Sequence, residues 1–307
     1  MLIKIFIVHL VFLWFLTCVP ALDSRSEFKI NDKFKNHGQF HNLFPLIMGG
    51  EKARIEEFPF VVQLAHWQNF GWFYKCVGII LETRIILTAA HCIPETNSYY
   101  YKRLGIEILA GTKDLLNWRE AKRKGAFRNI KKKHIRIHPL YNRTGYDYDV
   151  ALLKIGPQIL PFSEKIGSIE IGTTDWESQS NDTTIHKGTV VGWGYFKPYE
   201  LSPVLKKLDL EILPKNACLK EWGEVKDLEY LDRKFCAIFK KNLTNSACAG
   251  DSGGPFIVYG KLYGVVSSGK SNECEDTTRK SIQVTRLTHT KIATWIHETK
   301  KELLKDY

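Results

Sequence analysis

The stretch that most constrains this chain is Ala247–Pro255, which reads Ala-Cys-Ala-Gly-Asp-Ser-Gly-Gly-Pro. Glycine lacks a Cβ, so the backbone here can turn sharply and direct neighbouring N–H groups into one small space, where they can bind an oxyanion. A serine in such a turn is a nucleophile only when a general base lies within hydrogen-bond reach. The stretch therefore predicts a nucleophile, Ser252, and requires a base from elsewhere in the chain.

Two other motifs offer the partners that Ser252 needs. The run Thr88-Ala89-Ala90-His91-Cys92 offers His91 as the base, and Asp149-Val150-Ala151-Leu152-Leu153 offers an orienting carboxylate. Taken singly, these residues are more often a turn serine, a packed histidine and a capping aspartate. Together they occur in the chain order His, Asp, Ser, which is the order of chymotrypsin-fold proteases and not of subtilisins or α/β-hydrolases.

On these three motifs the chain resembles the trypsin/chymotrypsin family of serine proteases, from about Ile47 to Trp295. The resemblance implies that Ser252 attacks the scissile carbonyl, His91 carries the proton and Asp149 holds the imidazole. Asp147 is a rival carboxylate, but the Asp-Val-Ala-Leu-Leu match favours Asp149. The oxyanion donors would be the backbone N–H groups of Gly250 and Ser252. The loop Gly192-Trp193-Gly194 also matches a family loop, which packs around the region of Asp251.

The expected fold is all-β: two antiparallel six-stranded Greek-key β-barrels with the active site between them and a C-terminal α-helix. The residues agree, because Leu208, Leu210 and Ile212 alternate with charged residues as in a half-buried strand. Gly260-Lys261 lies between two β-rich runs and predicts a two-residue hairpin turn. Strands are predicted at 60–64, 78–87, 189–191, 205–213, 256–266 and 281–287, and the final helix presents Ile292, Trp295, Ile296 and Leu303 on one face.

The N-terminal residues predict export and activation by cleavage. Residues 1–21 carry an apolar run from Ile5 to Val19 and a small-residue cleavage site, as in a signal peptide; a membrane anchor is the alternative. Residues 22–46 are polar and predict a propeptide, which leaves 47–307 as the protease domain. In the family the freed ammonium of the new N-terminus, here Ile47, pairs with the carboxylate of Asp251. Leu46 stands where Arg or Lys normally precedes the cut, so a trypsin-like activator should fail.

Six cysteines remain after removal of Cys18 with the signal peptide, and fifteen pairings are open on arithmetic alone. The family resemblance selects Cys76–Cys92, Cys218–Cys236 and Cys248–Cys274. The first bridge would close a loop of about 15 residues, which contributes about 3 kcal/mol in the chain-entropy model. No Cys-x-x-Cys or Cys/His spacing of a zinc site occurs, and no metal or other cofactor is expected.

Substrate recognition is expected to involve Ser246, Ser267 and Gly269. By the resemblance Ser246 lies at the floor of the primary pocket, where an aspartate would select Arg or Lys, so an uncharged P1 side chain is expected. The segment from Ser267 to Gly269 would pair with extended substrate as an added strand. Ile282 aligns with a glycine or small residue of the pocket wall, which would make the pocket shallow.

The formal net charge of +11 favours acidic partners. The basic stretch 119–136 is interpreted either as a solvated loop or as an exosite for an acidic partner such as a sulfated glycan. The oxygen ligands of a calcium site are largely missing from it, so calcium is not expected there. No nucleic-acid-binding motif occurs. The other expected partners are protein substrates, an activating protease and serpin-type inhibitors. Glycosylation sequons begin at Asn142, Asn181 and Asn242.

The sequence therefore predicts a secreted serine endopeptidase that is made as a zymogen. The competing hypothesis is a secreted, catalytically silent protease homologue that binds partners through its loops. The Leu46-Ile47 junction and the substitution at Ile282 favour this second hypothesis, whereas the presence of His91, Asp149 and Ser252 favours the enzyme.

Overall fold

The computed structural model describes residues 50–68, 71–94, 104–115, 126–156, 160–173, 186–197, 200–222, 229–239, 248–269 and 281–305. The chain divides into two units, 1–43 and 44–307, and all described residues belong to the second. The expected signal peptide, the propeptide, Leu46 and Ile47 lie outside the described residues.

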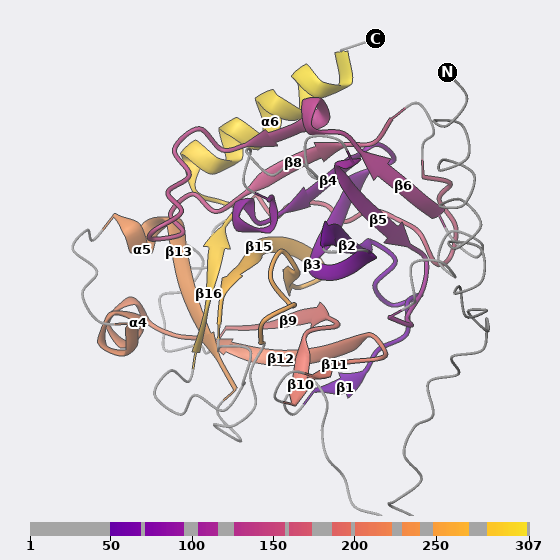
Figure 1. Cartoon of the computed structure of the whole chain (residues 1–307). Coiled ribbons are helices and arrows are strands. Elements are labelled where there is room, and N and C mark those ends of the chain that lie inside the picture. The colour runs from indigo at the N-terminus through magenta and orange to yellow at the C-terminus, as the bar shows by residue number, and fades with distance from the viewer. Residues whose placement is uncertain are drawn as a thin grey trace, which may run out of the picture. The chain divides into compact units, whose positions relative to one another are not determined.

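Seven antiparallel strands form the first sheet, which carries much of the N-terminal half of the second unit (Figure 1). Its Val, Ile and Leu side chains along β2, β3, β4 and β8 are fully buried, except for the partly buried Leu81, so these strands supply the hydrophobic core of this half. In spatial order the strands are β6 (Ala126–Ile130), β5 (Ile106–Ala110), β2 (Val61–Gln68), β3 (Gly71–Glu82), β4 (Ile85–Thr88), β8 (Ala151–Lys154) and β7 (Ile135–Ile137).

The second sheet closes on itself, because β9 pairs with both β14 and β12. Six strands thereby form a barrel around an apolar core that includes Phe235, Phe256 and Val284. The order is β1 (Glu51–Lys52), β12 (Lys206–Ile212), β13 (Lys234–Ile238), β16 (Ser281–Arg286), β15 (Lys261–Ser268), β14 (Pro255–Val258) and β9 (Lys187–Gly192). A separate ribbon pairs β10 (Tyr195–Lys197) with β11 (Glu200–Leu201). These sheets confirm the predicted all-β, chymotrypsin-type architecture.

The predicted strand at 256–266 is a hairpin, and its turn differs by one residue from the expected one. The two turn residues are Tyr259 and Gly260, not Gly260 and Lys261, because Val258 pairs with Lys261. Both have positive φ, 48° and 73°. This is the backbone of a primed two-residue turn, in which Tyr259 takes a conformation that usually favours glycine or asparagine.

The helix α6 (Thr290–Lys305) is the predicted C-terminal helix. It buries Ile292, Ile296 and Leu303 in the same core cluster as Leu152 of β8, and Figure 1 shows α6 beside β8. Two helices that the sequence pattern did not predict, α4 (Lys215–Trp222) and α5 (Tyr230–Arg233), precede β13. None of the helices in the described part of the chain combines the length and apolar character that crossing a membrane requires.

Candidate active site

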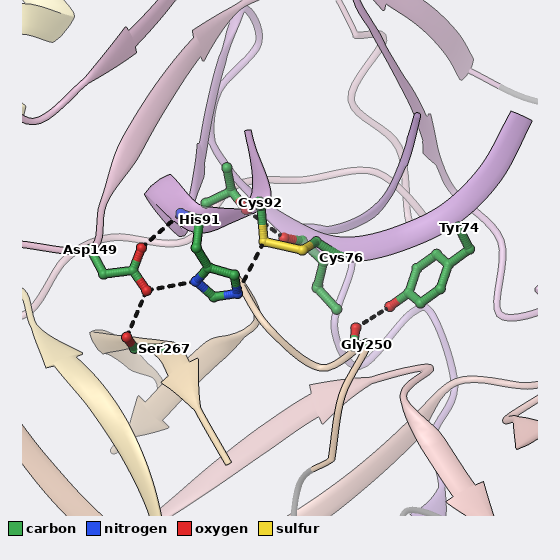
Figure 2. Close-up of a disulfide and its surroundings, with 9 residues drawn as sticks. Tyr74, Cys76, His91, Cys92, Asp149, Gly250 and Ser267 are labelled. Atoms are coloured by element: carbon green, nitrogen blue, oxygen red, sulfur yellow. Dashed lines mark hydrogen bonds and ion pairs between the residues drawn. A yellow bond between two sulfur atoms is a disulfide. The ribbon is translucent and has the colours of Figure 1, made fainter. Parts of the chain in front are cut away.

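His91 and Asp149 meet because of the register between two strands of the first sheet. Thr88 at the end of β4 pairs with Ala151 at the start of β8. The chain beyond β4 forms the short 3₁₀ helix η1 (Ala90–Cys92), which carries His91, while Asp149 lies two residues before Ala151. His91 Nδ1 lies 2.7 Å from Asp149 Oδ2, and the backbone N–H of His91 donates to Oδ1 at 2.9 Å (Figure 2).

Asp149 is fully buried, but its surroundings stabilise the carboxylate form. The Ser267 hydroxyl of β15 donates to Oδ2 at 2.6 Å. Burial raises the pKa of Asp149, but the His91 imidazole, the Lys234 ammonium and the Ser267 hydroxyl together lower it below its usual value. The sequence suggested only that the backbone of Ser267 contacts substrate. The structure shows that its side chain is also a hydrogen-bond donor to the Asp149 carboxylate.

The turn around Ser252 is anchored to both sheets by backbone hydrogen bonds. Val77 N–H of β3 donates to the Ser252 carbonyl at 2.8 Å, and Gly253 N–H donates to the Val266 carbonyl at 2.8 Å. Gly253 has a φ of 79°, and a Cβ there would lie 2.2 Å from Thr88 Oγ1 and 3.3 Å from Ala89 N. Glycine at this position therefore allows the residue after Ser252 to pack against the strand end that leads to His91.

The turn and the His91–Asp149 pair are neighbours, but the Ser252 hydroxyl makes no hydrogen bond to His91 among the described contacts. His91 Nε2 instead lies 3.9 Å from Cys92 Sγ, which is bonded to Cys76 in a disulfide (Figure 2). A disulfide sulfur is a weak acceptor at most, so Nε2 has no strong hydrogen-bond partner among the residues that the structure describes. Catalytic hydrogen bonds often form fully only with substrate bound.

Gly250 has a φ of 96°, the left-handed region that favours glycine, and a side chain pins its carbonyl. The hydroxyl of Tyr74 donates to the Gly250 oxygen at 2.6 Å (Figure 2). Burial, together with the nearby Asp251 carboxylate, raises the pKa of Tyr74 well above its usual value, so the phenol remains a donor. Tyr74 thus helps to fix the backbone at the expected oxyanion donor, a contact that no local sequence pattern indicated.

Asp251 is buried inside the loop Gly192-Trp193-Gly194, as the family resemblance implied. Its Oδ1 accepts from Gly194 N–H at 2.8 Å and its Oδ2 from Cys248 N–H at 3.0 Å. A Cβ at Gly192 or Gly194 would lie 2.3 Å from an Asp251 oxygen, so glycine is required at both positions. Burial raises the pKa of Asp251 to about 6, because the two backbone donors only partly offset the desolvation.

The substrate-binding residues are only partly described. Ser267 is buried, Ser268 and Gly269 are half-buried at the end of β15, and Ser246 lies outside the described residues. Ile282 of β16 is fully buried in the barrel core with Val266 and Val284. Tyr146, which the sequence analysis did not single out, packs edge-on against His91 with ring centroids 5.1 Å apart.

The structure joins Cys76 to Cys92 and Cys218 to Cys236, the pairs that the resemblance implied. Cys248 is also disulfide-bonded, while Cys274 lies outside the described residues. Asn142 is exposed, and the sequons at Asn181 and Asn242 lie outside the described residues. Of the basic stretch 119–136, residues 119–125 likewise lie outside them.

Comparison with known proteins assigns the family. The family model for trypsin matches residues 47–296. A trypsin from Simulium vittatum is 31% identical over 225 residues, which cover 73% of this chain and 82% of that protein. Hypodermin-A from Hypoderma lineatum is 31% identical over 73% of this chain and 77% of its own. A chymotrypsin-like serine proteinase from Haliotis rufescens is 28% identical over 75% of this chain and 84% of its own.

Proposed function

Because this chain belongs to the trypsin family of serine proteases, we propose that it is a serine endopeptidase with Ser252 as nucleophile, His91 as general base and Asp149 as the orienting carboxylate. The observation that carries this proposal is the 2.7 Å contact between the His91 and Asp149 side chains beside the Ser252 turn. The Asp149 carboxylate can only accept a hydrogen bond, so His91 Nδ1 carries the proton and donates it to this bond. His91 Nε2 is then free to accept a proton.

In the proposed reaction Ser252 Oγ bonds to the scissile carbonyl carbon while its proton passes to His91 Nε2. The carbonyl π electrons move to oxygen, and the N–H groups of Gly250 and Ser252 stabilise that oxyanion. The intermediate then breaks its C–N bond, and His91 returns the proton to the leaving amine. Water hydrolyses the resulting acyl-enzyme by the same steps, with His91 again as the base.

An uncharged P1 residue, apolar or small, is the proposed preference. The sequence supports this, because Ser246 and not an aspartate stands at the position that the family resemblance places at the pocket floor, so a charged side chain would lack a counter-ion there. Cleavage of a peptide library by the active enzyme measures the preference.

We also propose that the protein is secreted, after removal of residues 1–21, and is activated by a protease that cleaves between Leu46 and Ile47. The carboxylate of Asp251 supports the proposed cleavage, because the described residues provide it with two backbone donors and no cation, which leaves room for the new ammonium of Ile47 as its partner. Glycosylation at Asn142, inhibition by serpin-type proteins and an acidic partner at the stretch 119–136 belong to the same proposal. Asn142 is exposed, as glycosylation requires. Lys131, Lys132 and Lys133 are also exposed, as binding of an acidic partner requires.

A fluorophosphonate probe separates an enzyme from a silent homologue, because only an activated serine beside an oxyanion hole reacts with it. We expect labelling of the protein that begins at Ile47 and no labelling of its Ser252→Ala variant, which should retain its disulfides and fold. Turnover of peptides should fall by about 10⁶ in that variant. Lack of labelling in the cleaved wild-type protein would favour the silent homologue, and labelling of the Ser252→Ala variant would show that another residue is the nucleophile.

A further inference from the structure

Behind the His91–Asp149 pair lies a buried lysine that the proposed mechanism does not use. Lys234 is the first residue of β13 and is 1% exposed. Its Nζ donates to Ser267 Oγ at 2.9 Å and lies 3.4 Å from Gln283 Oε1. The Tyr230 ring covers the ammonium at 5.2 Å from its centroid. An ammonium held this far from water requires a nearby negative charge or strong acceptors.

A chain of hydrogen bonds connects Lys234 to the proposed triad, and each donor in it is fixed. An ammonium can only donate, so Ser267 Oγ accepts from Lys234 and its single proton is left for Asp149 Oδ2, 2.6 Å away. Asp149 Oδ2 in turn lies 2.7 Å from His91 Nδ1. Lys234 therefore fixes the orientation of the Ser267 hydroxyl, and with it the hydrogen bonding of the carboxylate that holds His91.

The charge of Lys234 acts mainly on Asp149. The other nearby carboxylate, Asp147, is held by Arg233 through two contacts of 2.8 Å. Tyr141 and Tyr230 also lie near Asp149, but burial raises the pKa of both phenols, so they stay neutral. His91 itself is faced by Asp149, by the Tyr146 ring and by the Cys92 sulfur.

The lysine is charged where a histidine base titrates. Burial lowers the pKa of Lys234 to about 8, while Asp149 and Asp147 oppose that shift. An unperturbed histidine titrates near pH 6.5. Throughout the acid side of that range Lys234 is therefore a cation, and it partly neutralises the Asp149 charge that would otherwise stabilise an imidazolium.

We propose that Lys234 is a positioning residue of the triad, which orients Ser267 and shifts the acid limb of the pH–rate profile toward lower pH. The consequence is an enzyme that stays active in mildly acidic surroundings. This inference rests on the proposed function, since it requires His91 to be the base.

The test compares Lys234→Met, Lys234→Gln and Lys234→Arg with the wild type, all cleaved to begin at Ile47. The rates of fluorophosphonate inactivation and of peptide hydrolysis are measured from pH 5 to pH 9. In the Met and Gln variants we expect the acid limb to move up by about 0.5–1 pH unit, since a unit charge is lost near Asp149. At pH 5 they should react about 3–10-fold more slowly, each relative to its own plateau, while Lys234→Arg should keep the wild-type limb.

Lys206 provides a matched control, because it is also a lysine with 1% exposure on a strand of the same barrel. Burial lowers the pKa of Lys206 to about 8 as well, but the charged group that acts on it is the Lys52 ammonium and not a triad carboxylate. Lys206→Met should leave the acid limb where it is in the wild type. If Lys234→Met does not fold, Lys234→Gln decides, because it removes the charge and keeps a hydrogen-bond donor.

The outcomes are distinguishable. An unmoved acid limb in active Met or Gln variants would overturn the inference and leave Lys234 a purely structural residue. An equal shift in Lys206→Met would also overturn it, because the effect would then be nonspecific. Absence of labelling in the wild-type protein would instead mean that the proposed function fails.

Discussion

Asp149 and Asp251 are both almost completely buried, at 0% and 2% exposure, and yet their pKa values shift in opposite directions. The pKa of Asp149 is lowered, because His91, Lys234 and Ser267 together outweigh the burial that raises it. The pKa of Asp251 is raised to about 6, because burial exceeds the stabilisation from the N–H groups of Cys248 and Gly194. Among the described residues Asp149 has a cation nearby, Lys234, whereas Asp251 is bonded only to backbone N–H groups.

The difference indicates which half of the site is assembled by folding alone. Asp149 draws its partners from the 3₁₀ helix η1 and from two strands of the second sheet, so the folded chain itself keeps it ionised. A buried carboxylate without a cation favours a proton or a newly formed positive charge. The environment of Asp251 is therefore suited to a group supplied after folding, which is the role proposed for the ammonium of Ile47.

The largest effect is expected from Asp149→Asn. Oδ1 accepts from His91 N–H, so the amide NH₂ must take the place of Oδ2, which faces His91 Nδ1 and the Ser267 hydroxyl. This forces the proton of the imidazole onto Nε2, where a base must accept. Peptide hydrolysis should fall by about 10⁴ with the fold intact. Activity within tenfold of the wild type would transfer the role to Asp147.

A smaller loss is expected from Asp251→Asn, measured after cleavage. In a Leu46→Arg background trypsin should release the Ile47 terminus, which gives both proteins the same N-terminus. Both Asp251 oxygens accept backbone N–H groups, so an amide loses one bond as well as the charge. The oxyanion turn should loosen and turnover fall by about 10²–10³. Full activity in the Asp251→Asn protein would show that the turn is assembled without this ion pair.

The smallest effect is on the stability of the uncleaved chain. The pKa of Asp251 in the fold, about 6, lies above its ordinary value of 3.8, so the folded state binds the proton more tightly. This contribution to stability is complete below about pH 4 and is lost as the pH rises to about 6, with a total of about 3 kcal/mol. Urea unfolding of the Ser252→Ala precursor between pH 4 and pH 7 should show the loss, and the same protein with Asp251→Asn should not. Identical slopes in the two proteins would contradict the assignment.

The repetitive parts of the fold could be predicted because their signals are local. Alternation along 205–213 indicated β12, and the helical spacing of Ile292, Ile296 and Leu303 indicated α6. The hairpin turn was placed one residue too late, because register is fixed by the pairing of Val258 with Lys261 and not by the position of the glycine. The helix α4 was missed, since its eight residues bury only Cys218 and show little amphipathic pattern.

The sequence by itself determined the candidate nucleophile, base and carboxylate, because each is marked by its immediate neighbours in the chain. Glycines flank the serine, a cysteine follows the histidine, and an apolar run follows the aspartate. Only the tertiary structure decided what surrounds them. A lysine that opens an apolar strand could as well point to solvent, and its link to Asp149 passes through Ser267, far away in the chain. Strand pairing places Lys234, Ser267 and Asp149 together, and burial then makes that one ammonium act on the active site instead of on water.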